Sequence, residues 1–340
     1  MSQHRNTVLI LLLLLSIAIL IIFPETAISG ASNGIELCIK TLIPSLFPYM
    51  VLSSLLLNLL DTVHIPPLKW ISKFCKIPSN SGNILLVSLL GGYPVGAKIV
   101  SESYERGAIN KIDAMRLIGF CNNAGPAFIF GVIGQAFSSF SVTLILWLIH
   151  ISSAIITGFL LPQKDITRFQ FHQTDKRPAG PTIQQCVSTM GVICAWALLF
   201  RIVIAYTEKL LPEHIPNQYF VIIAGFLELS NGCILLNLIE DTALRFLIAS
   251  CLISLGGCCV TMQTASIARK IGLSYYFPGK ITQTTISILL SLIAQIFLFS
   301  TSLSPCLCVC IGLAGISVLF LTIRILHHQN NSRFCSNYAV

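Results

Sequence analysis

Residues 83–100 read NILLVSLLGGYPVGAKIV, which is long enough to cross a bilayer as a helix but is interrupted near its middle. Glycine permits tight turns and proline removes a backbone donor, so the GGYPVG stretch at residues 91–96 breaks the helix. In hydrocarbon, a broken helix persists only where protein covers it or where it lines a wet cavity. The stretch predicts either a functional turn that presents backbone amides beside Tyr93 or a packing hinge between helices.

A second interruption, CNNAGP at residues 121–126, follows in the next apolar segment. The second half of the chain repeats this order, because the segment at 219–239 contains Glu228 and Asn231 and the segment at 242–268 contains a Gly-Gly pair. Corresponding interruptions in two halves are the best sequence pointer to the binding site of a transporter. The pattern therefore predicts two structural repeats whose breaks share one site.

The composition of the 340 residues supports a membrane protein, since 54% are hydrophobic and 10% are charged. An ordinary soluble domain has about 25% charged residues. The net charge of +8 comes from Lys and Arg scattered over short loops, without the aromatic-rich basic patch of a nucleic-acid-binding surface. We therefore expect the lipid bilayer, and no nucleic acid, as a partner.

The distribution of Lys and Arg predicts the topology, because cytoplasmic loops collect these residues. The predicted fold class is an all-α polytopic membrane protein with about eight transmembrane helices and two re-entrant helical hairpins, arranged as two inverted repeats. The expected division is, in order, an N-terminal transmembrane helix at 1–29, the first repeat at 30–162, a cytoplasmic linker at 163–182, the inverted second repeat at 183–300, and a C-terminal transmembrane helix with a cytoplasmic tail at 301–340.

Two catalytic motifs are missing from the sequence, which contains no HExxH and no Walker loop. The 13 cysteines form no CxxC pair, and most lie in apolar runs where cysteine acts as a small hydrophobe. We expect no enzyme activity, no metal site and no cofactor. A coupling ion and a homo-oligomeric assembly are both compatible with the sequence.

Polar side chains within the broken segments are the candidate contacts for a solute. Asn122 and Asn123 can donate and accept, so they could bind a polar solute or tie the broken helix ends together. Lys98 could face a cavity and favour an anion or extend to the membrane interface, whereas Arg116 is expected at the cytoplasmic interface.

Glu228 is the acid placed inside a hydrophobic segment, and intramembrane carboxylates usually serve ion or proton pathways. It could bind a coupling cation or proton, pair with a cation such as Arg201, or simply lie near the outer surface. The glycines at 256–257, with Gln263, would form the matching break of the second repeat. The complete set of candidate solute-binding residues is Gly91, Gly92, Tyr93, Pro94, Gly96, Lys98, Asn122, Asn123, Gly125, Glu228, Asn231, Gly256, Gly257 and Gln263.

Three motifs resemble a known family. GYPVGAK at 92–98, CNNAGP at 121–126 and SLGGCCVTMQ at 254–263 are similar to the family of the sporulation integral membrane protein YlbJ, also called SpoVV. That family carries the nucleoside-recognition or Gate domain, which it shares with concentrative nucleoside transporters and the FeoB iron transporter. The resemblance extends over roughly residues 30–325.

The resemblance implies a membrane protein made in the mother cell of endospore-forming bacteria. It implies transport of dipicolinic acid, a small anionic solute, across the outer forespore membrane. A planar pyridine dicarboxylate would suit the Tyr93 ring and the amides of Asn122 and Asn123. A nucleoside or cation transporter of the wider Gate group, and a non-transporting assembly protein of the spore envelope, are the alternatives.

Overall fold

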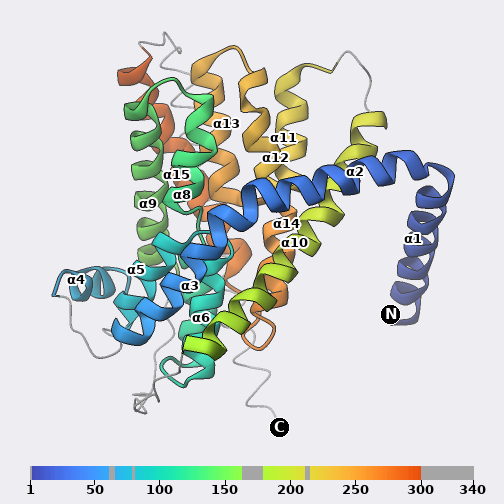
Figure 1. Cartoon of the computed structure of the whole chain (residues 1–340). Helices are drawn as coiled ribbons and strands as arrows, with labels where there is room; N and C mark the ends of the chain where they lie inside the picture. The colour runs from blue at the N-terminus through green and yellow to red at the C-terminus, as the bar shows by residue number, and fades with distance from the viewer. Residues whose placement is uncertain (1, 61–65, 79–80, 163–178, 211–214, 300–340) are drawn as a thin grey trace.

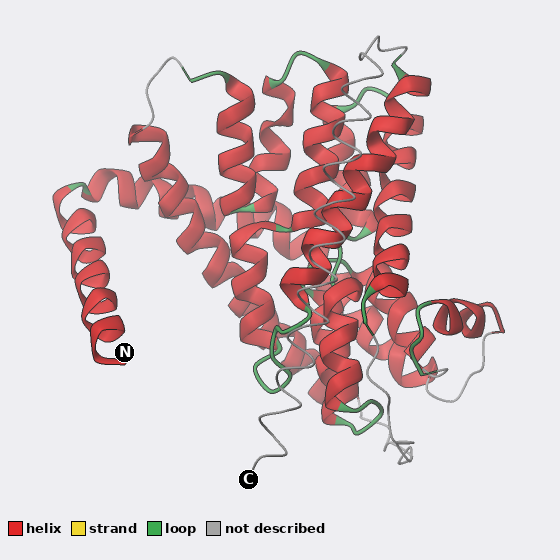
Figure 2. Cartoon of the chain, turned by 180° about the vertical axis from the view of Figure 1, so that it is seen from behind, coloured by secondary structure: helices red, strands yellow, loops and turns green. Residues whose placement is uncertain are grey.

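The computed structural model describes residues 2–60, 66–78, 81–162, 179–210 and 215–299. Within these ranges the secondary structure is helical, and no strand is present (Figure 2). The predicted all-α class is therefore confirmed. Within these ranges, 5 helical segments are long and apolar enough to cross a membrane: Pro24–Leu57, Phe140–Leu160, Ile183–Leu210, Thr242–Ile267 and Tyr276–Leu298. The larger count of eight spans with two re-entrant hairpins stays a prediction.

The first half of the chain contains two interrupted helical elements between long helices. Its elements are α1 (Ser2–Ile22), α2 (Pro24–Leu37), a π-helical turn (Cys38–Leu42), α3 (Ile43–Leu60), α4 (Pro66–Phe74), α5 (Ser81–Gly91), α6 (Val95–Glu105), α7 (Lys111–Cys121), α8 (Pro126–Gly131), a 3-10 turn (Ile133–Ala136) and α9 (Phe140–Leu160). Helices α5 and α6 pack against each other across the break, whereas residues 122–125 separate α7 from α8 as a non-helical stretch.

The second half has the same order of unbroken and broken elements. Its elements are α10 (Ala179–Leu210), α11 (Asn217–Leu227), α12 (Leu229–Ile234), a 3-10 turn (Leu235–Leu238), α13 (Thr242–Leu255), α14 (Gly257–Ile267) and α15 (Tyr276–Leu298). Helices α11 and α12 pack against each other on either side of Glu228, and α13 and α14 form one apolar segment interrupted at Gly256. In Figure 1, α11 and α12 lie in the upper half of the molecule, and α5 and α6 lie in the lower half.

The N-terminal region contains two helices in close succession. The first helix ends at Ile22, and the second begins at Pro24, inside the segment 1–29. Pro24 suits the start of a helix because the first turn needs no backbone donor there. Gly30 and Gly34 then face α10 so closely that a Cβ would lie 2.9 Å from the Ile202 Cα and 3.0 Å from the Leu198 Cα, respectively. Small residues allow such close helix packing in membranes. In the sequence, however, a stretch of small residues resembles a loop.

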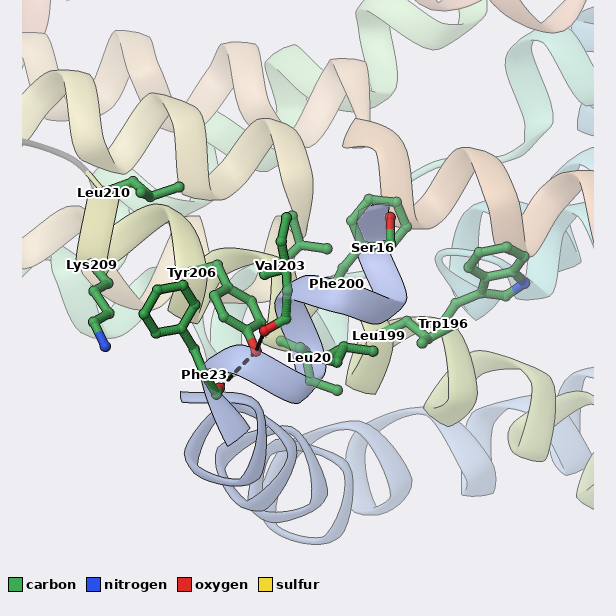
Figure 3. Close-up of a pocket in the computed structure, with 12 residues that line it drawn as sticks. Ser16, Leu20, Phe23, Trp196, Leu199, Phe200, Val203, Tyr206, Lys209 and Leu210 are labelled. Carbon is green, nitrogen blue, oxygen red and sulfur yellow. Dashed lines mark hydrogen bonds between the residues drawn. The ribbon is translucent and has the colours of Figure 1, made fainter. Parts of the chain in front are cut away.

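Helix α1 stands apart from the rest of the molecule, joined to it through α2 (Figure 1). Between α1 and α10 lies a groove of about 620 Å³, which is lined almost wholly by apolar side chains such as Leu20 and Val203 (Figure 3). The Tyr206 hydroxyl donates to the Phe23 carbonyl at 2.9 Å and holds the groove's two walls together. The lining of the groove therefore offers few polar groups to a polar solute.

Two segments of the predicted plan lie outside the described residues. These are most of the predicted linker, at 163–178, and the predicted C-terminal helix and tail from residue 301 onward.

Candidate functional site

The tip of the α5–α6 pair lies directly on the break between α7 and α8. Gly92 has a φ of +81°, and a Cβ there would lie 2.8 Å from the Gly125 nitrogen. A Cβ on Gly96 would lie 2.4 Å from the Cys121 carbonyl oxygen. These glycines are therefore needed for backbone to touch backbone between two interrupted elements.

The second half makes the equivalent contact. Gly257 has a φ of +75°, and a Cβ on it would lie 2.8 Å from the carbonyl oxygens of Gly225 and Phe226 at the end of α11. Gly256, with a φ of +81°, is the left-handed residue that ends α13. In both halves, a packed pair of short helices lies against the interruption of the next segment.

Tyr93 connects the two halves. Its hydroxyl donates to the Ile253 carbonyl at 3.0 Å, so it satisfies one of the free carbonyls at the end of α13. The Tyr93 ring also packs into the apolar cluster around Phe246 and Leu252 of the second half. The break of the first half is thereby anchored in the break of the second.

Asn122 and Asn123 are both buried, and both are engaged by protein groups in this conformation. The Asn122 side chain accepts from the Ala97 N–H at 3.3 Å and donates to the Thr264 hydroxyl of α14 at 2.8 Å. Asn123 donates to the Phe120 carbonyl at 2.6 Å. In this conformation the two amides bind protein groups of α6, α7 and α14, and a contact with a solute stays a prediction.

Lys280 lies at the centre of this polar cluster, although it was not among the predicted site residues. Its Nζ donates to the Tyr93 hydroxyl at 2.7 Å and to the Asn122 carbonyl at 2.5 Å. Gln283, one turn further along α15, donates to the Asn123 side-chain oxygen at 2.7 Å. The available signal was a basic residue immediately before the apolar run that starts at residue 281, which resembles a loop residue at a membrane edge.

Glycines also explain how Lys280 reaches the break. A Cβ on Gly279 would lie 2.1 Å from the Gly119 carbonyl oxygen, so α15 and α7 touch through their backbones. His150 of α9 was likewise not predicted, and its Nε2 accepts from the Ala124 N–H at 3.0 Å. Lys280 and His150 lie far in sequence from the break at 122–125, so no local sequence pattern predicts these contacts.

A small cavity lies between the halves, with a volume of about 30 Å³. It brings together four of the predicted residues, namely Tyr93, Gly125, Glu228 and Gln263. Its remaining lining is Leu42, Leu46, Ala124, Phe128, Ile193, Leu229, Ser230 and Val260. This space suffices for about one water molecule, whereas pockets for small organic ligands measure roughly 300–1,000 Å³. The described conformation is therefore closed at the site.

Glu228 is buried at the edge of this cavity, where it caps α12. Its carboxylate accepts from the N–H groups of Ser230 at 3.1 Å and Asn231 at 2.8 Å, and from the Asn231 side-chain amide at 2.8 Å. The alternative pairing with Arg201 is wrong, because Arg201 binds Glu208 at 3.0 Å.

The two cations predicted near the first break do not line the cavity. Lys98 is buried and forms an ion pair with Glu102, and it also donates to the Ser54 hydroxyl at 2.8 Å. Arg116, expected at the membrane interface, is 1% exposed and donates to the carbonyls of Cys75 at 2.7 Å and Gly158 at 2.6 Å. Free carbonyls at nearby helix ends attract a guanidinium, and this explains the difference from the prediction.

The remaining candidates are backbone elements of the breaks. Gly91 ends α5, and Pro94 precedes the first residue of α6. Their place at the tip of the α5–α6 pair agrees with the predicted turn.

The fold and this site define a helical membrane protein in which two halves meet through interrupted helices. Its resemblance to the YlbJ family is confirmed by a curated relative, the sporulation integral membrane protein YlbJ of Bacillus subtilis strain 168. The two are 28% identical over 135 residues, which cover 39% of this chain and 33% of the relative. No family model matches the chain, and no solved structure matches it.

Proposed function

We propose that this chain is a carrier that moves a small anionic metabolite across a membrane during sporulation, with dipicolinic acid as the leading solute. The observation that supports it best is the meeting of the breaks of both halves around one buried cavity. The similarity to YlbJ supports the sporulation context. On this proposal the chain is not an enzyme, and it acts in the outer forespore membrane.

The proposed mechanism is alternating access, in which one half rocks against the other around a fixed site. The pairs α5–α6 and α11–α12 would be re-entrant hairpins that enter from opposite sides, and their positions in the lower and upper halves of Figure 1 support this arrangement. The cavity of about 30 Å³ would belong to the closed intermediate, and rocking would widen it toward one side at a time.

The side chains around the cavity suit a planar aromatic carboxylate. The Tyr93 ring offers an aromatic face beside the cavity. Asn122 and Asn123 do not line the cavity in this conformation, but their amides could exchange their protein partners for solute oxygens when the halves separate.

Glu228 favours a second candidate function, which is transport of a cation alone or together with the solute. Its buried carboxylate borders a cavity of about the size of one water molecule. On this proposal the ion would be the coupling ion of the same carrier, or the cargo of a cation transporter.

Uptake into proteoliposomes tests the proposed function. We expect purified protein in liposomes to accumulate labelled dipicolinate well above protein-free liposomes, with saturation as the solute concentration rises. Imposed Na⁺ and proton gradients would identify coupling, and labelled uridine serves as the competing solute class. Uptake of uridine or cation without dipicolinate would replace the proposed solute, and uptake of none of them would contradict the carrier.

A further inference from the structure

Lys280 differs from the other buried Lys and Arg side chains in the described ranges, which are Lys98 and Arg116. Lys98 has the Glu102 carboxylate beside it, and Arg116 serves carbonyls at helix ends. Lys280, at 2% exposure, donates only to neutral oxygens among the described residues.

The neutral oxygens around Lys280 come from both halves. Its Nζ lies 2.7 Å from the Tyr93 hydroxyl, 2.5 Å from the Asn122 carbonyl and 2.9 Å from the Gln283 side-chain oxygen, with the Asn123 side-chain oxygen at 3.4 Å. An ammonium has three donors, so these oxygens already occupy all of them. Neutral dipoles therefore occupy the positions around the Lys280 ammonium where a carboxylate would fully offset its charge. Burying a charge without an opposite partner is costly.

Tyr93 separates Lys280 from the cavity. The Lys280 ammonium lies 4.8 Å from the centre of the Tyr93 ring, and Tyr93 itself lines the cavity. Lys280 itself does not line the cavity, so the Tyr93 side chain would have to move for the ammonium to meet a solute there. Intramembrane charges that face a protein interior usually mark substrate or ion pathways.

We propose that Lys280 is the carboxylate-binding residue of this chain, and that a solute carboxylate displaces the Tyr93 and Asn122 oxygens from its ammonium. This inference rests on the proposed carrier function and names the chemical group that the carrier recognises. Since the same two oxygens belong to the tip of the α5–α6 pair and to the α7–α8 break, their displacement loosens the closed interface. Solute binding and opening are thereby linked through one side chain.

Binding measurements on the purified full chain test the inference. The probes are dipicolinate and its neutral analogue pyridine-2,6-dicarboxamide, which has the same ring and the same substitution pattern. We expect wild-type protein to bind the dicarboxylate at least about tenfold more tightly than the dicarboxamide. In Lys280→Met, which keeps the chain length but not the charge, this preference falls to about one. Lys280→Arg retains part of the preference because it retains the charge.

Lys270→Met is the matched control. Lys270 is exposed and pairs with Glu105 at 2.9 Å, so its loss removes one positive charge without touching the interface. A preference retained in Lys280→Met would overturn the inference, while dipicolinate uptake by wild-type protein would leave the carrier intact. Equal affinity of wild-type protein for the two probes also overturns the inference, and this measurement does not depend on whether Lys280→Met folds. If wild-type protein neither binds nor takes up dipicolinate, both the inference about Lys280 and the proposal of dipicolinate as the solute are contradicted.

Discussion

Replacement of Asn122 and Asn123 together by alanine is expected to abolish dipicolinate uptake. The two side chains bind four groups: the Ala97 N–H, the Phe120 carbonyl, and, across the two halves, the Thr264 hydroxyl and the Gln283 amide. A buried polar group that loses its partner costs about 1–3 kcal/mol. The double variant therefore loses both these protein contacts and the amides that a solute would use. Uptake per mole of folded protein in proteoliposomes is the measurement.

A matched control separates function from general destabilisation. Ser250 and Ser291 are also buried, and their hydroxyls bond each other at 2.7 Å between α13 and α15, outside the lining of the cavity. The Ser250→Ala/Ser291→Ala variant should lose thermal stability but keep its uptake per folded molecule. Normal uptake by the double asparagine variant would favour a non-transporting assembly protein, in which the breaks only serve packing.

Gly92→Ala is expected to destabilise the protein far more than Gly107→Ala. Both glycines have a positive φ, of +81° and +73°, so alanine incurs a similar backbone cost of about 1–2 kcal/mol at each. At Gly92, however, the new Cβ would lie 2.8 Å from the backbone nitrogen of Gly125, whereas nothing lies within 4 Å at Gly107. The steric conflict should add about 1–3 kcal/mol and separate the hairpin tip from the break.

Thermal unfolding in detergent measures this difference, and proteoliposome uptake measures its consequence. Gly107→Ala should keep most of its uptake, whereas Gly92→Ala should lose most of it. Equal midpoint shifts for the two variants would mean that the contact between Gly92 and Gly125 adds nothing to the stability of the closed form.

The positions of the breaks could be predicted from the sequence because their causes are local. Glycine and proline at 91–96, the Asn-Asn pair before Gly125, and the glycines at 256–257 each interrupt a helix by their own backbone chemistry. The all-α class follows equally directly from the length and apolar character of the segments.

Features that depend on contacts between distant segments could not be predicted. Lys280 enters the site because α15 touches α7 at Gly279 and Gly119, and no single segment contains that information. Arg116 is buried because carbonyls of residues 75, 76, 158 and 161 converge on it. The close packing of Gly30 on α10 is likewise a contact between segments that are far apart in the sequence.

The central claim is that the cavity between the two halves opens to water on alternate sides. Ser230 lines this cavity, so Ser230→Cys in a background without the native cysteines would place one reactive thiol there. The measurement is its labelling rate in oriented vesicles with a membrane-impermeant maleimide added to either side. The account predicts labelling from both sides, with dipicolinate changing the two rates in opposite directions. A thiol that stays unreactive from both sides, or reacts from one side regardless of the solute, would contradict it.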